Sequence, residues 1–210
     1  MKGYIVGNNV TKNIRIGLVI MASGLGRRFG GNKLMENLGD KPLIKWIMDS
    51  TEGLFDRRIV VTRSEDVKAL CDSLSIQCIL HALPNRNDTV RLGLSEIKEE
   101  IDYCFFVPGD QPLISKESIT KLILAVSNNK DNNDMIVRTS YGDTACSPMG
   151  FHKKYFNELL ELPEGKGGNW IAKNYPEKVC AVDVQNEYEL WDIDTVADLE
   201  RVKNVISRYA

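Results

Sequence analysis

Short apolar runs alternate with segments of helical periodicity along most of this chain. Strands are predicted for the apolar runs at 14–21, 57–62, 76–81 and 102–110. Helices are predicted for the periodic segments at 42–55, 64–74, 88–100 and 115–129, with Pro42, Ser64 and Ser115 at helix starts. This order predicts β-α-β units, and therefore a three-layer α/β/α architecture around a mostly parallel, twisted sheet.

The C-terminal third is less regular and is expected to add a mixed part to the sheet. Strands are predicted at 134–140, 147–151 and 178–184, and helices at 153–162 and 194–210. No Pro/Ser-rich linker divides residues 14–210, so we expect them to form a single domain. Residues 1–13 are polar and turn-rich, and they are predicted to form a loose N-terminal arm.

The composition excludes several classes of function. The formal net charge is −2 and the pI is about 5.8, so there is no basic field for a nucleic-acid partner. No apolar stretch has the length of a membrane span and the N-terminus lacks a signal-peptide pattern, so we expect no membrane partner and a cytoplasmic location. The five cysteines are scattered and are expected to be reduced thiols, and two histidines are too few for a histidine-rich metal centre.

The stretch VIMASGLGRRFGGNKL, residues 19–34, places glycines and cations directly after the first predicted strand. Ligands of doubly wound sheets bind beyond the carboxyl ends of the strands, which is where this loop lies. Gly24 and Gly26 would let the backbone approach a phosphate chain, and Arg28 and Lys33 add positive charge. The spacing fits neither a Walker A loop nor G-x-G-x-x-G, because Phe29 stands in place of the third glycine. The alternative is a plain glycine turn with solvated arginines.

Two further segments carry candidate metal ligands. The run FVPGDQPLIS, residues 106–115, ends a predicted strand on a Gly-Asp turn that presents Asp110. Near the C-terminus, WDIDT places Asp192 and Asp194 on one face of an extended segment. Mg²⁺ takes one or two protein carboxylates and fills its shell with phosphate oxygens and water, and these aspartates provide such carboxylates. The alternatives are an ordinary turn at Asp110 and a helix cap at 192–195.

In this order, the segments resemble the nucleotidyltransferase family that includes molybdenum cofactor cytidylyltransferase and its guanylyl counterpart. ASGLGRRFGGNKL is similar to the family loop A-A-G-x-G-x-R-[MF]-G-x-x-K-L, and GDQPLIS is similar to its G-D-x-P motif. EGKGGNW, residues 164–170, is similar to G-D-K-G-G-R, and DIDTVADL to D-I-D-T-P-E-D-L. The resemblance runs from about Ile16 to the last predicted helix, and it implies a Rossmann-like nucleotidyltransferase fold.

The resemblance implies transfer of CMP from CTP to the phosphate of molybdopterin, with release of pyrophosphate. It implies Mg²⁺, or Mn²⁺ in its place, held by Asp110 with Asp194 or Asp192, and it implies Arg28 and Lys33 as catalytic cations. The nucleotide-binding residues that it implies are Ala22, Ser23, Gly24, Leu25, Gly26, Arg27, Asn85, Thr89 and Gly109. Those implied for the acceptor are Ser147, Lys166, Gly167 and Gly168. A molybdenum hydroxylase apo-enzyme is the implied protein partner.

Several positions depart from the family pattern. Cys146 and Ser147 stand where family members often carry Gly-His before the proline, and Thr89 stands where a serine is usual. The guanylyl branch tends to read A-G-G at the start of the loop and the cytidylyl branch A-A-G, whereas this chain has Ala22-Ser23-Gly24. We therefore expect cytidylyl transfer. The alternatives are guanylyl transfer to the same cofactor, cytidylyl transfer to a sugar-phosphate or isoprenoid-precursor acceptor, and a nucleotide-binding regulatory module without turnover.

Overall fold

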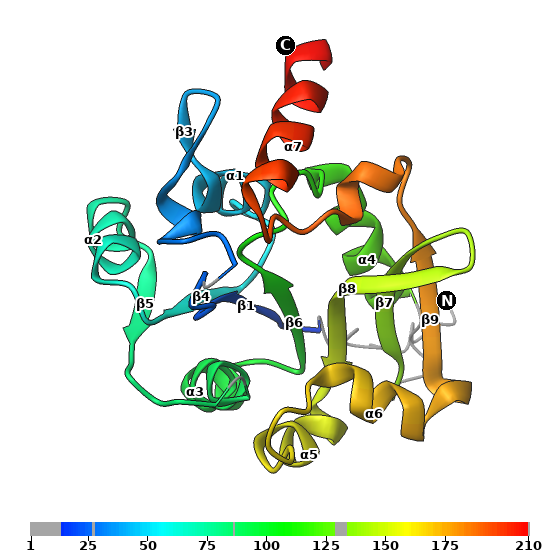
Figure 1. The fold of residues 1–210 in the computed structure, drawn as a ribbon. Helices are drawn as coiled ribbons and strands as arrows, with labels where there is room; N and C mark the ends of the chain where they lie inside the picture. Colours follow the sequence, from blue (N-terminus) through cyan, green and yellow to red (C-terminus); the bar gives the residue numbers. More distant parts are fainter. Residues whose placement is uncertain (1–13, 27, 86, 129–133, 210) are drawn as a thin grey trace, which may run out of the picture.

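The computed structural model describes residues 14–26, 28–85, 87–128 and 134–209, so the predicted arm at 1–13 and Arg27 lie outside the described residues. The main sheet has seven strands in the order β5-β4-β1-β6-β8-β7-β9 (Figure 1). They are β1 (Ile16–Ala22), β4 (Arg57–Thr62), β5 (Gln77–Leu80), β6 (Tyr103–Pro108), β7 (Ile136–Tyr141), β8 (Thr144–His152) and β9 (Val179–Asp183). A separate hairpin is formed by β2 (Asn37–Leu38) and β3 (Lys41–Pro42).

The pairing directions confirm a mostly parallel sheet with a mixed C-terminal part. β1 pairs in parallel with both β4 and β6, and β4 pairs in parallel with β5. β8 runs antiparallel to its two neighbours, β6 and β7, and β7 then pairs in parallel with β9. The strands β1, β4 and β6 therefore end at the same edge of the sheet, where the segments that follow them meet.

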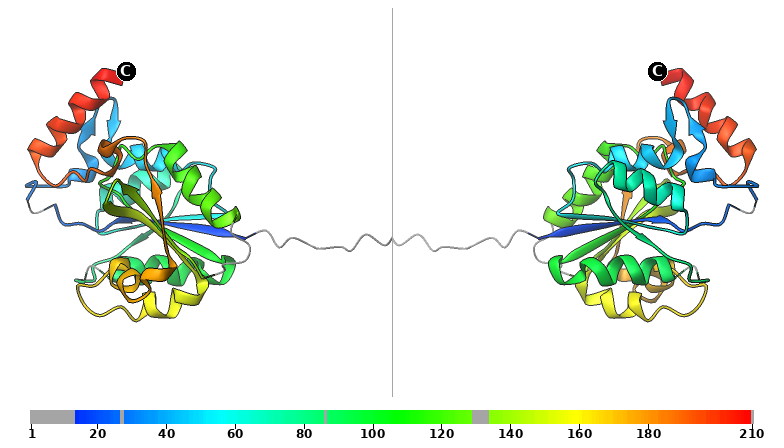
Figure 2. Two further views of the ribbon diagram at one scale, coloured as in Figure 1. Left: turned by 90° about the vertical axis from the view of Figure 1, so that its right-hand side faces the viewer. Right: turned by 90° about the vertical axis from the view of Figure 1, so that its left-hand side faces the viewer.

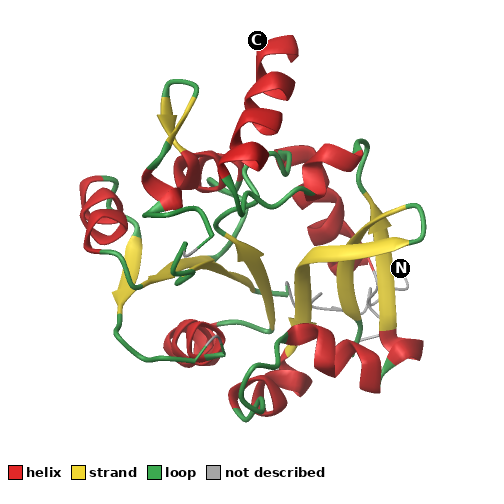
Figure 3. Cartoon of the chain, in the orientation of Figure 1, coloured by secondary structure: helices red, strands yellow, loops and turns green. Residues whose placement is uncertain are grey.

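Helices cover both faces of this sheet, as the edge-on views of Figure 2 and the colouring of Figure 3 show. One face carries α1 (Leu43–Ser50), α2 (Glu65–Ser73), α4 (Lys116–Asn128) and α7 (Val196–Tyr209). The other face carries α3 (Asp88–Ile97), α5 (Phe156–Leu160) and α6 (Gly168–Asn174). Short 3-10 helices occupy 33–35, 98–100, 153–155, 176–178 and 187–190. Within the described residues, no helix combines the length and the apolar character needed to cross a membrane.

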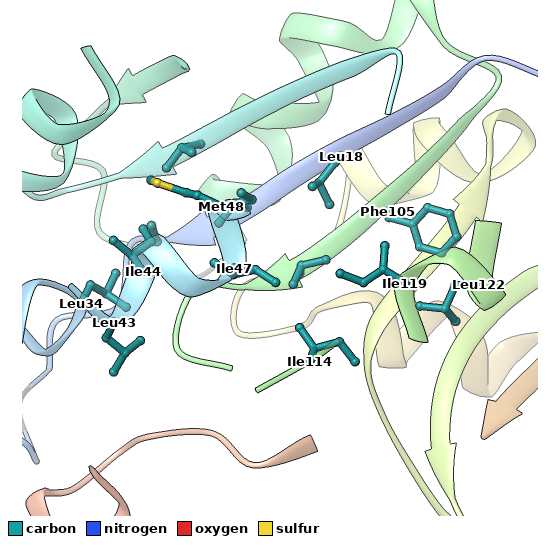
Figure 4. Packing of buried hydrophobic residues seen from close by; sticks show 14 of the residues in the cluster. Leu18, Leu34, Leu43, Ile44, Ile47, Met48, Phe105, Ile114, Ile119 and Leu122 are labelled. Carbon is teal, nitrogen blue, oxygen red and sulfur yellow. The ribbon is translucent and has the colours of Figure 1, made fainter. Parts of the chain in front are cut away.

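Strand β1 lies inside the sheet with apolar clusters on both of its faces. Leu18 belongs to the cluster under α1 and α4, whereas Val19 belongs to the cluster under α3. Figure 4 shows the first cluster, in which Leu18 and Phe105 of the sheet lie with Ile47 of α1 and Ile119 of α4. A strand buried on both faces must be apolar at successive positions, which explains the continuous apolar run in the sequence.

Most predicted elements are present, and the differences have local causes. Ser64 caps α2 as predicted, because its Oγ accepts a hydrogen bond from the N–H of Val67 at 3.3 Å. The helix predicted at 42–55 ends at Ser50, and a turn follows in which Gly53 adopts a φ of +72°. The sequence did not indicate the two-residue strands β2 and β3 or the helix α6, because such short elements carry too few residues to show a period.

Gly93 lets α3 pack closely on the sheet. A Cβ atom at this position would lie 2.5 Å from Cγ1 of Val19 and 3.0 Å from Cγ2 of Val61. Replacing glycine by alanine in a helix normally stabilises by about 1 kcal/mol, but overpacking should outweigh that gain here. We expect Gly93→Ala to lower the free energy of unfolding by about 1–3 kcal/mol in urea denaturation.

The matched control is Ser95→Ala, an exposed position of the same helix, which should leave the urea midpoint unchanged or slightly raised. A midpoint for Gly93→Ala at or above the wild-type value would contradict the close packing of α3 on β1 and β4.

Candidate active site

A cavity of about 610 Å³ opens at the edge where β1 and β6 end, and it is lined by segments that are far apart in the sequence. The predicted site residues on its wall are Ser23, Gly24, Leu25, Gly26, Arg28, Lys33, Thr89, Asp110, Ser147, Asp192 and Asp194. The fold thus brings the glycine loop, the Asp110 turn and the C-terminal aspartates together. This is the edge at which doubly wound sheets bind ligands.

The glycine loop leaves β1 at Ala22 and requires glycine at one position. Gly26 has a φ of +58°, and a Cβ atom there would lie 2.1 Å from the carbonyl oxygen of Gly31. Gly24 has a φ outside the left-handed region and open space beside it, so its own conformation does not require glycine. Among the described residues, the backbone N–H groups of Gly24, Leu25 and Gly26 have no hydrogen-bond acceptor. They are therefore available to an anionic ligand.

Lys33 is buried beside the cavity and is held by three oxygen atoms. Its Nζ lies 2.6 Å from Oδ2 of Asp110, 2.7 Å from the carbonyl oxygen of Ile193 and 3.1 Å from Oδ1 of Asp194. The side chain of Lys33 is 6% exposed, against 25% for Asp110 and 39% for Asp194. Burial lowers the pKa of Lys33, but the charges and hydrogen bonds of the two aspartates outweigh burial and raise that pKa, so the ammonium group stays protonated.

The same contacts fasten the C-terminal segment to the Asp110 turn. The N–H of Ile193 donates to the carbonyl oxygen of Asp110 at 2.9 Å. Arg28, whose side chain is 73% exposed, donates from its guanidinium to Oδ2 of Asp194 at 2.8 Å. Both predicted cations thus contact the predicted metal ligands. All three N–H donors of Lys33 have acceptors, so a direct contact with a phosphate would require Lys33 to release one of these oxygens.

The aspartates fit the donor set that Mg²⁺ uses together with a nucleotide. Asp110 and Asp194 approach the same ammonium group, and Asp192 lines the same cavity. Their oxygens are hard donors, and Mg²⁺ usually takes only one or two from the protein when phosphates supply others. No group of three or more His, Cys, Asp and Glu side chains in the described part of the chain could hold a metal ion by itself. A divalent cation at this site would therefore depend on phosphate oxygens of the nucleotide.

A chain of hydrogen bonds that the sequence did not reveal fixes Ser23. The N–H of Leu83 donates to Nδ1 of His81 at 3.2 Å, which assigns the proton of the neutral ring to Nε2. This Nε2–H then donates to Oγ of Ser23 at 2.8 Å, and the Ser23 hydroxyl donates to the carbonyl oxygen of Val61 at 3.1 Å. Ser23 therefore offers a ligand only a lone pair, and it cannot turn away from the cavity without breaking both hydrogen bonds.

Arg63 also lines the cavity, although the sequence analysis did not identify it as a site residue. It follows the last residue of β4, and its guanidinium donates to the carbonyl oxygens of Leu83 and Asn85, the latter at 3.3 Å. Its Nε is buried and has no hydrogen-bond partner among the residues that the structure describes. A cation directly after a parallel strand lies at the ligand-binding edge of the sheet, and this position was the signal that could have identified Arg63.

The remaining predicted residues do not line the cavity, and these are Ala22, Asn85, Gly109, Lys166, Gly167 and Gly168. Gly109 instead packs against the end of β1, because its N–H donates to the carbonyl oxygen of Met21 at 2.9 Å. The segment before α6 is joined to the start of α3 by Asn87, whose Nδ2 donates to the carbonyl oxygen of Leu162 at 2.7 Å. Gln111 links the Asp110 turn to β8, because its Nε2 donates to the carbonyl oxygen of Ser147 at 3.0 Å.

We expect Lys33→Met to destabilise the protein, because it removes the charge between Asp110 and Asp194 while keeping most of the aliphatic stem. Breaking a buried ion pair costs about 3–5 kcal/mol, and the partial exposure of both aspartates places the expected loss near 3 kcal/mol. Urea denaturation at neutral pH measures it. In the control, Lys68→Met removes an exposed pair with Asp72 and should leave the urea midpoint close to the wild-type value. Equal losses in the two variants would contradict the anchoring role of Lys33.

Comparison with known proteins gives matches over most of this chain. The family model described as the MobA-like NTP transferase domain matches residues 18–179. A protein of Natranaerobius thermophilus named "Probable molybdenum cofactor guanylyltransferase" is 32% identical over 146 residues, which cover 66% of this chain and 67% of the relative. A protein of the same name from Pyrococcus furiosus is 27% identical over 203 residues, which cover 90% of this chain and 97% of the relative. The 2-C-methyl-D-erythritol 4-phosphate cytidylyltransferase of Endomicrobium trichonymphae is 30% identical over 137 residues, which cover 59% of this chain and 63% of the relative.

Solved structures share the fold of this chain. A nucleotidyl transferase from Methanothermobacter superposes with a TM-score of 0.77 at 17% identity, covering 93% of this chain and 99% of that one. The protein Rv0371C of Mycobacterium tuberculosis, solved in complex with manganese, superposes with a TM-score of 0.68 at 19% identity. The superposition covers 90% of this chain and 98% of that one. These likenesses confirm the Rossmann-like α/β/α fold. Because the family model spans well over half of its length, this chain belongs to the MobA-like NTP transferase domain family and is a nucleotidyltransferase.

Proposed function

We propose that this protein transfers CMP from CTP to the phosphate of a molybdopterin-type cofactor and releases pyrophosphate. An oxygen of the acceptor phosphate forms a bond to the α-phosphorus of CTP, and the bond from that phosphorus to the oxygen bridging to the β-phosphate breaks. The leaving pyrophosphate takes the electron pair of the broken bond. No side-chain nucleophile is required, so the rate depends on positioning the two phosphates and on stabilising negative charge.

The glycine loop and Arg28 are proposed to hold the triphosphate. The N–H groups of residues 24–26 have no acceptor within the described part of the chain, and they can donate to phosphate oxygens. Arg28 makes only an exposed ion pair with Asp194, which is weak enough to be exchanged for a pyrophosphate oxygen. Lys33 is proposed as the second catalytic cation, and it keeps Asp110 and Asp194 at the cavity before the nucleotide binds.

Asp110 and Asp194, with Asp192 on the same wall, are proposed to hold Mg²⁺ or Mn²⁺. The manganese complex of the structural neighbour from Mycobacterium tuberculosis supports a divalent cation in a protein of this fold. When bound, such an ion supplies positive charge that neutralises phosphate oxygens and polarises the α-phosphoryl group. The ion pairs with Lys33 and Arg28 hold the carboxylates of Asp110 and Asp194 at the cavity.

The fixed side chain of Ser23 is the observation that carries the choice of CTP. A glycine at this position, as in the A-G-G pattern, would leave open the space that the Ser23 side chain occupies. Because His81 and the Val61 carbonyl oxygen hold Ser23 in place, that space stays filled when a ligand enters. A smaller pocket favours the single ring of cytosine over guanine. The lone pair of Ser23 Oγ can accept a hydrogen bond from the exocyclic amino group of cytosine.

Guanylyl transfer to the same cofactor is the second candidate function. Two of the relatives described above are named molybdenum cofactor guanylyltransferases, and one of them matches over 90% of this chain. A third candidate is cytidylyl transfer to an isoprenoid precursor, which the named activity of the Endomicrobium relative favours. Pyrophosphate release with each nucleotide, using molybdopterin or 2-C-methyl-D-erythritol 4-phosphate as the acceptor, separates the three candidates.

We expect CTP to be preferred over GTP by about 10²-fold or more in kcat/KM, measured as pyrophosphate release with the two nucleotides in competition. Ser23→Gly should reduce this preference at least about tenfold by opening the pocket to guanine. Ser23→Ala is the matched control, because it keeps the Cβ atom and removes only the hydroxyl, and it should retain most of the preference. A wild-type preference for GTP would overturn the cytidylyl assignment. Equal effects of the glycine and alanine variants would reject the steric explanation.

We also expect the KM for the nucleotide to rise at acidic pH. Burial lowers the pKa of His81, the charge of Arg63 lowers it further and Asp88 opposes them, so it lies below the ordinary value of 6.5. As the pH falls through that pKa, Nδ1 gains a proton and can no longer accept the N–H of Leu83, which disturbs the hydrogen bonds that hold Ser23. Nucleotide KM should therefore be constant above pH 6.5 and increase below it.

His81→Asn should remove this increase, whereas His152→Asn should retain it, because His152 does not line the cavity. The measurement is nucleotide KM across the pH range at saturating acceptor. An identical acid limb in wild type and His81→Asn would exclude His81 as the titrating group.

A further inference from the structure

Two of the five cysteines, Cys71 and Cys78, come together between a helix and the edge of the sheet. Cys71 lies on α2 and is fully buried, whereas Cys78 lies on β5 and is half-buried. Cys78 pairs with Val60 of β4 and packs against the apolar cluster that contains both Val60 and Cys71. The two thiols therefore lie on the same face of the sheet, where α2 packs beside β5 (Figure 1).

The two thiol groups are in direct contact. The chain turns back at the end of α2, where the N–H of Ile76 donates to the carbonyl oxygen of Cys71 at 2.9 Å. This turn returns Cys78 to the helix, and the S–H of Cys71 donates a hydrogen bond to the sulfur of Cys78. The two sulfur atoms are therefore neighbours in the folded chain, which is the first requirement for a disulfide.

The surroundings make the two thiols unequal. The hydrogen bond from Cys71 lowers the pKa of Cys78, although burial opposes it. Of the nearby charges, Lys68 lowers the pKa of Cys78 and Asp72 raises it. The same hydrogen bond raises the pKa of Cys71, and burial raises it further. Because β5 is an edge strand, a reagent meets the more exposed and more acidic Cys78 first, with Cys71 buried behind it.

We propose that Cys71 and Cys78 form a redox pair that closes to a disulfide on reaction with a low-molecular-weight disulfide. The Cys78 thiolate attacks one sulfur of the reagent, whose S–S bond breaks to leave a mixed disulfide and one free thiolate. Cys71 then loses its proton and attacks the Cys78 sulfur, and the second half of the reagent leaves as a thiolate. The two cysteines are oxidised, the reagent is reduced, and the two thiol protons pass to the released thiolates. No nucleotide or acceptor takes part, so this inference is independent of the proposed function.

Oxidised glutathione tests the pair in the folded wild-type protein. Trypsin cuts after residues 68 and 86, and the peptide 69–86 between them contains both cysteines of the pair and no other. After oxidation of the folded protein, followed by unfolding and alkylation, we expect this peptide to carry no alkyl label and to have lost two hydrogen atoms in mass. Dithiothreitol should restore both thiols. Alkylation of both cysteines would overturn the proposal, and so would a disulfide that forms only in urea.

Single variants assign the two roles. Cys71→Ala should stop at a stable glutathione adduct on Cys78, because no second thiol is there to displace the glutathione. Cys78→Ala should leave Cys71 unmodified, because Cys71 is buried. The matched control is Cys180→Ala, a half-buried cysteine of β9 at the opposite edge of the sheet, which should form the disulfide as the wild type does. A glutathione adduct that persists on Cys78 of the wild-type protein would overturn the proposal.

Discussion

The ammonium group of Lys33 holds together three segments that are separated by most of the chain. It contacts Asp110 after β6, and it contacts Ile193 and Asp194 before α7. The backbone hydrogen bond between Ile193 and Asp110 reinforces the same junction. The glycine loop, the acidic turn and the C-terminal segment therefore depend on one buried charge. Without it, the carboxylates of Asp110 and Asp194 would repel each other, and the segment that carries Asp192 would lose two of its contacts with the rest of the site.

The side of the cavity assigned to the base is built in a different way, from neutral hydrogen bonds. Ser23, His81 and the backbone of Leu83 form a chain in which each polar atom has one defined role. Arg63 adds a second connection, because it donates to the carbonyl oxygen of Leu83. These contacts join the end of β1 to the segment after β5 across the intervening β4. A pocket whose wall is fixed in this way can reject a larger base by shape, since its side chains cannot move aside without losing hydrogen bonds.

The reversed strand β8 gives the opposite side of the site its distinct character. Because β8 runs antiparallel to β6, Ser147 in its first half lies at the edge where β6 ends, beside the Asp110 turn. Gln111 joins the two by its hydrogen bond to the Ser147 carbonyl oxygen. The bulge opposite Ser147 belongs to this mixed part of the sheet. The parallel half of the sheet thus forms the nucleotide side, and the mixed half forms the proposed acceptor side.

The sequence by itself determined the fold class and the segments of the site. Continuous apolar runs and helical periods identified the parallel strands and the longer helices, because burial of both sheet faces imposes those patterns locally. The glycine loop and Asp110 were identifiable because the residues that follow parallel strands meet at one edge, whereas Asp192 and Asp194 were identifiable because an extended segment places them on one face. Very short elements such as β2, β3 and α6 were not, since a few residues cannot show a period.

Only the tertiary structure decided which groups these residues contact. Lys33 was expected to face a phosphate, but it is enclosed by two carboxylates and a carbonyl oxygen. His81 and Arg63 belonged to no motif, and their roles come from hydrogen bonds to residues in the segments that follow other strands. Sequence spacing fixes contacts within an element, whereas pairing between distant charges depends on distances and burial that exist only after the sheet has formed.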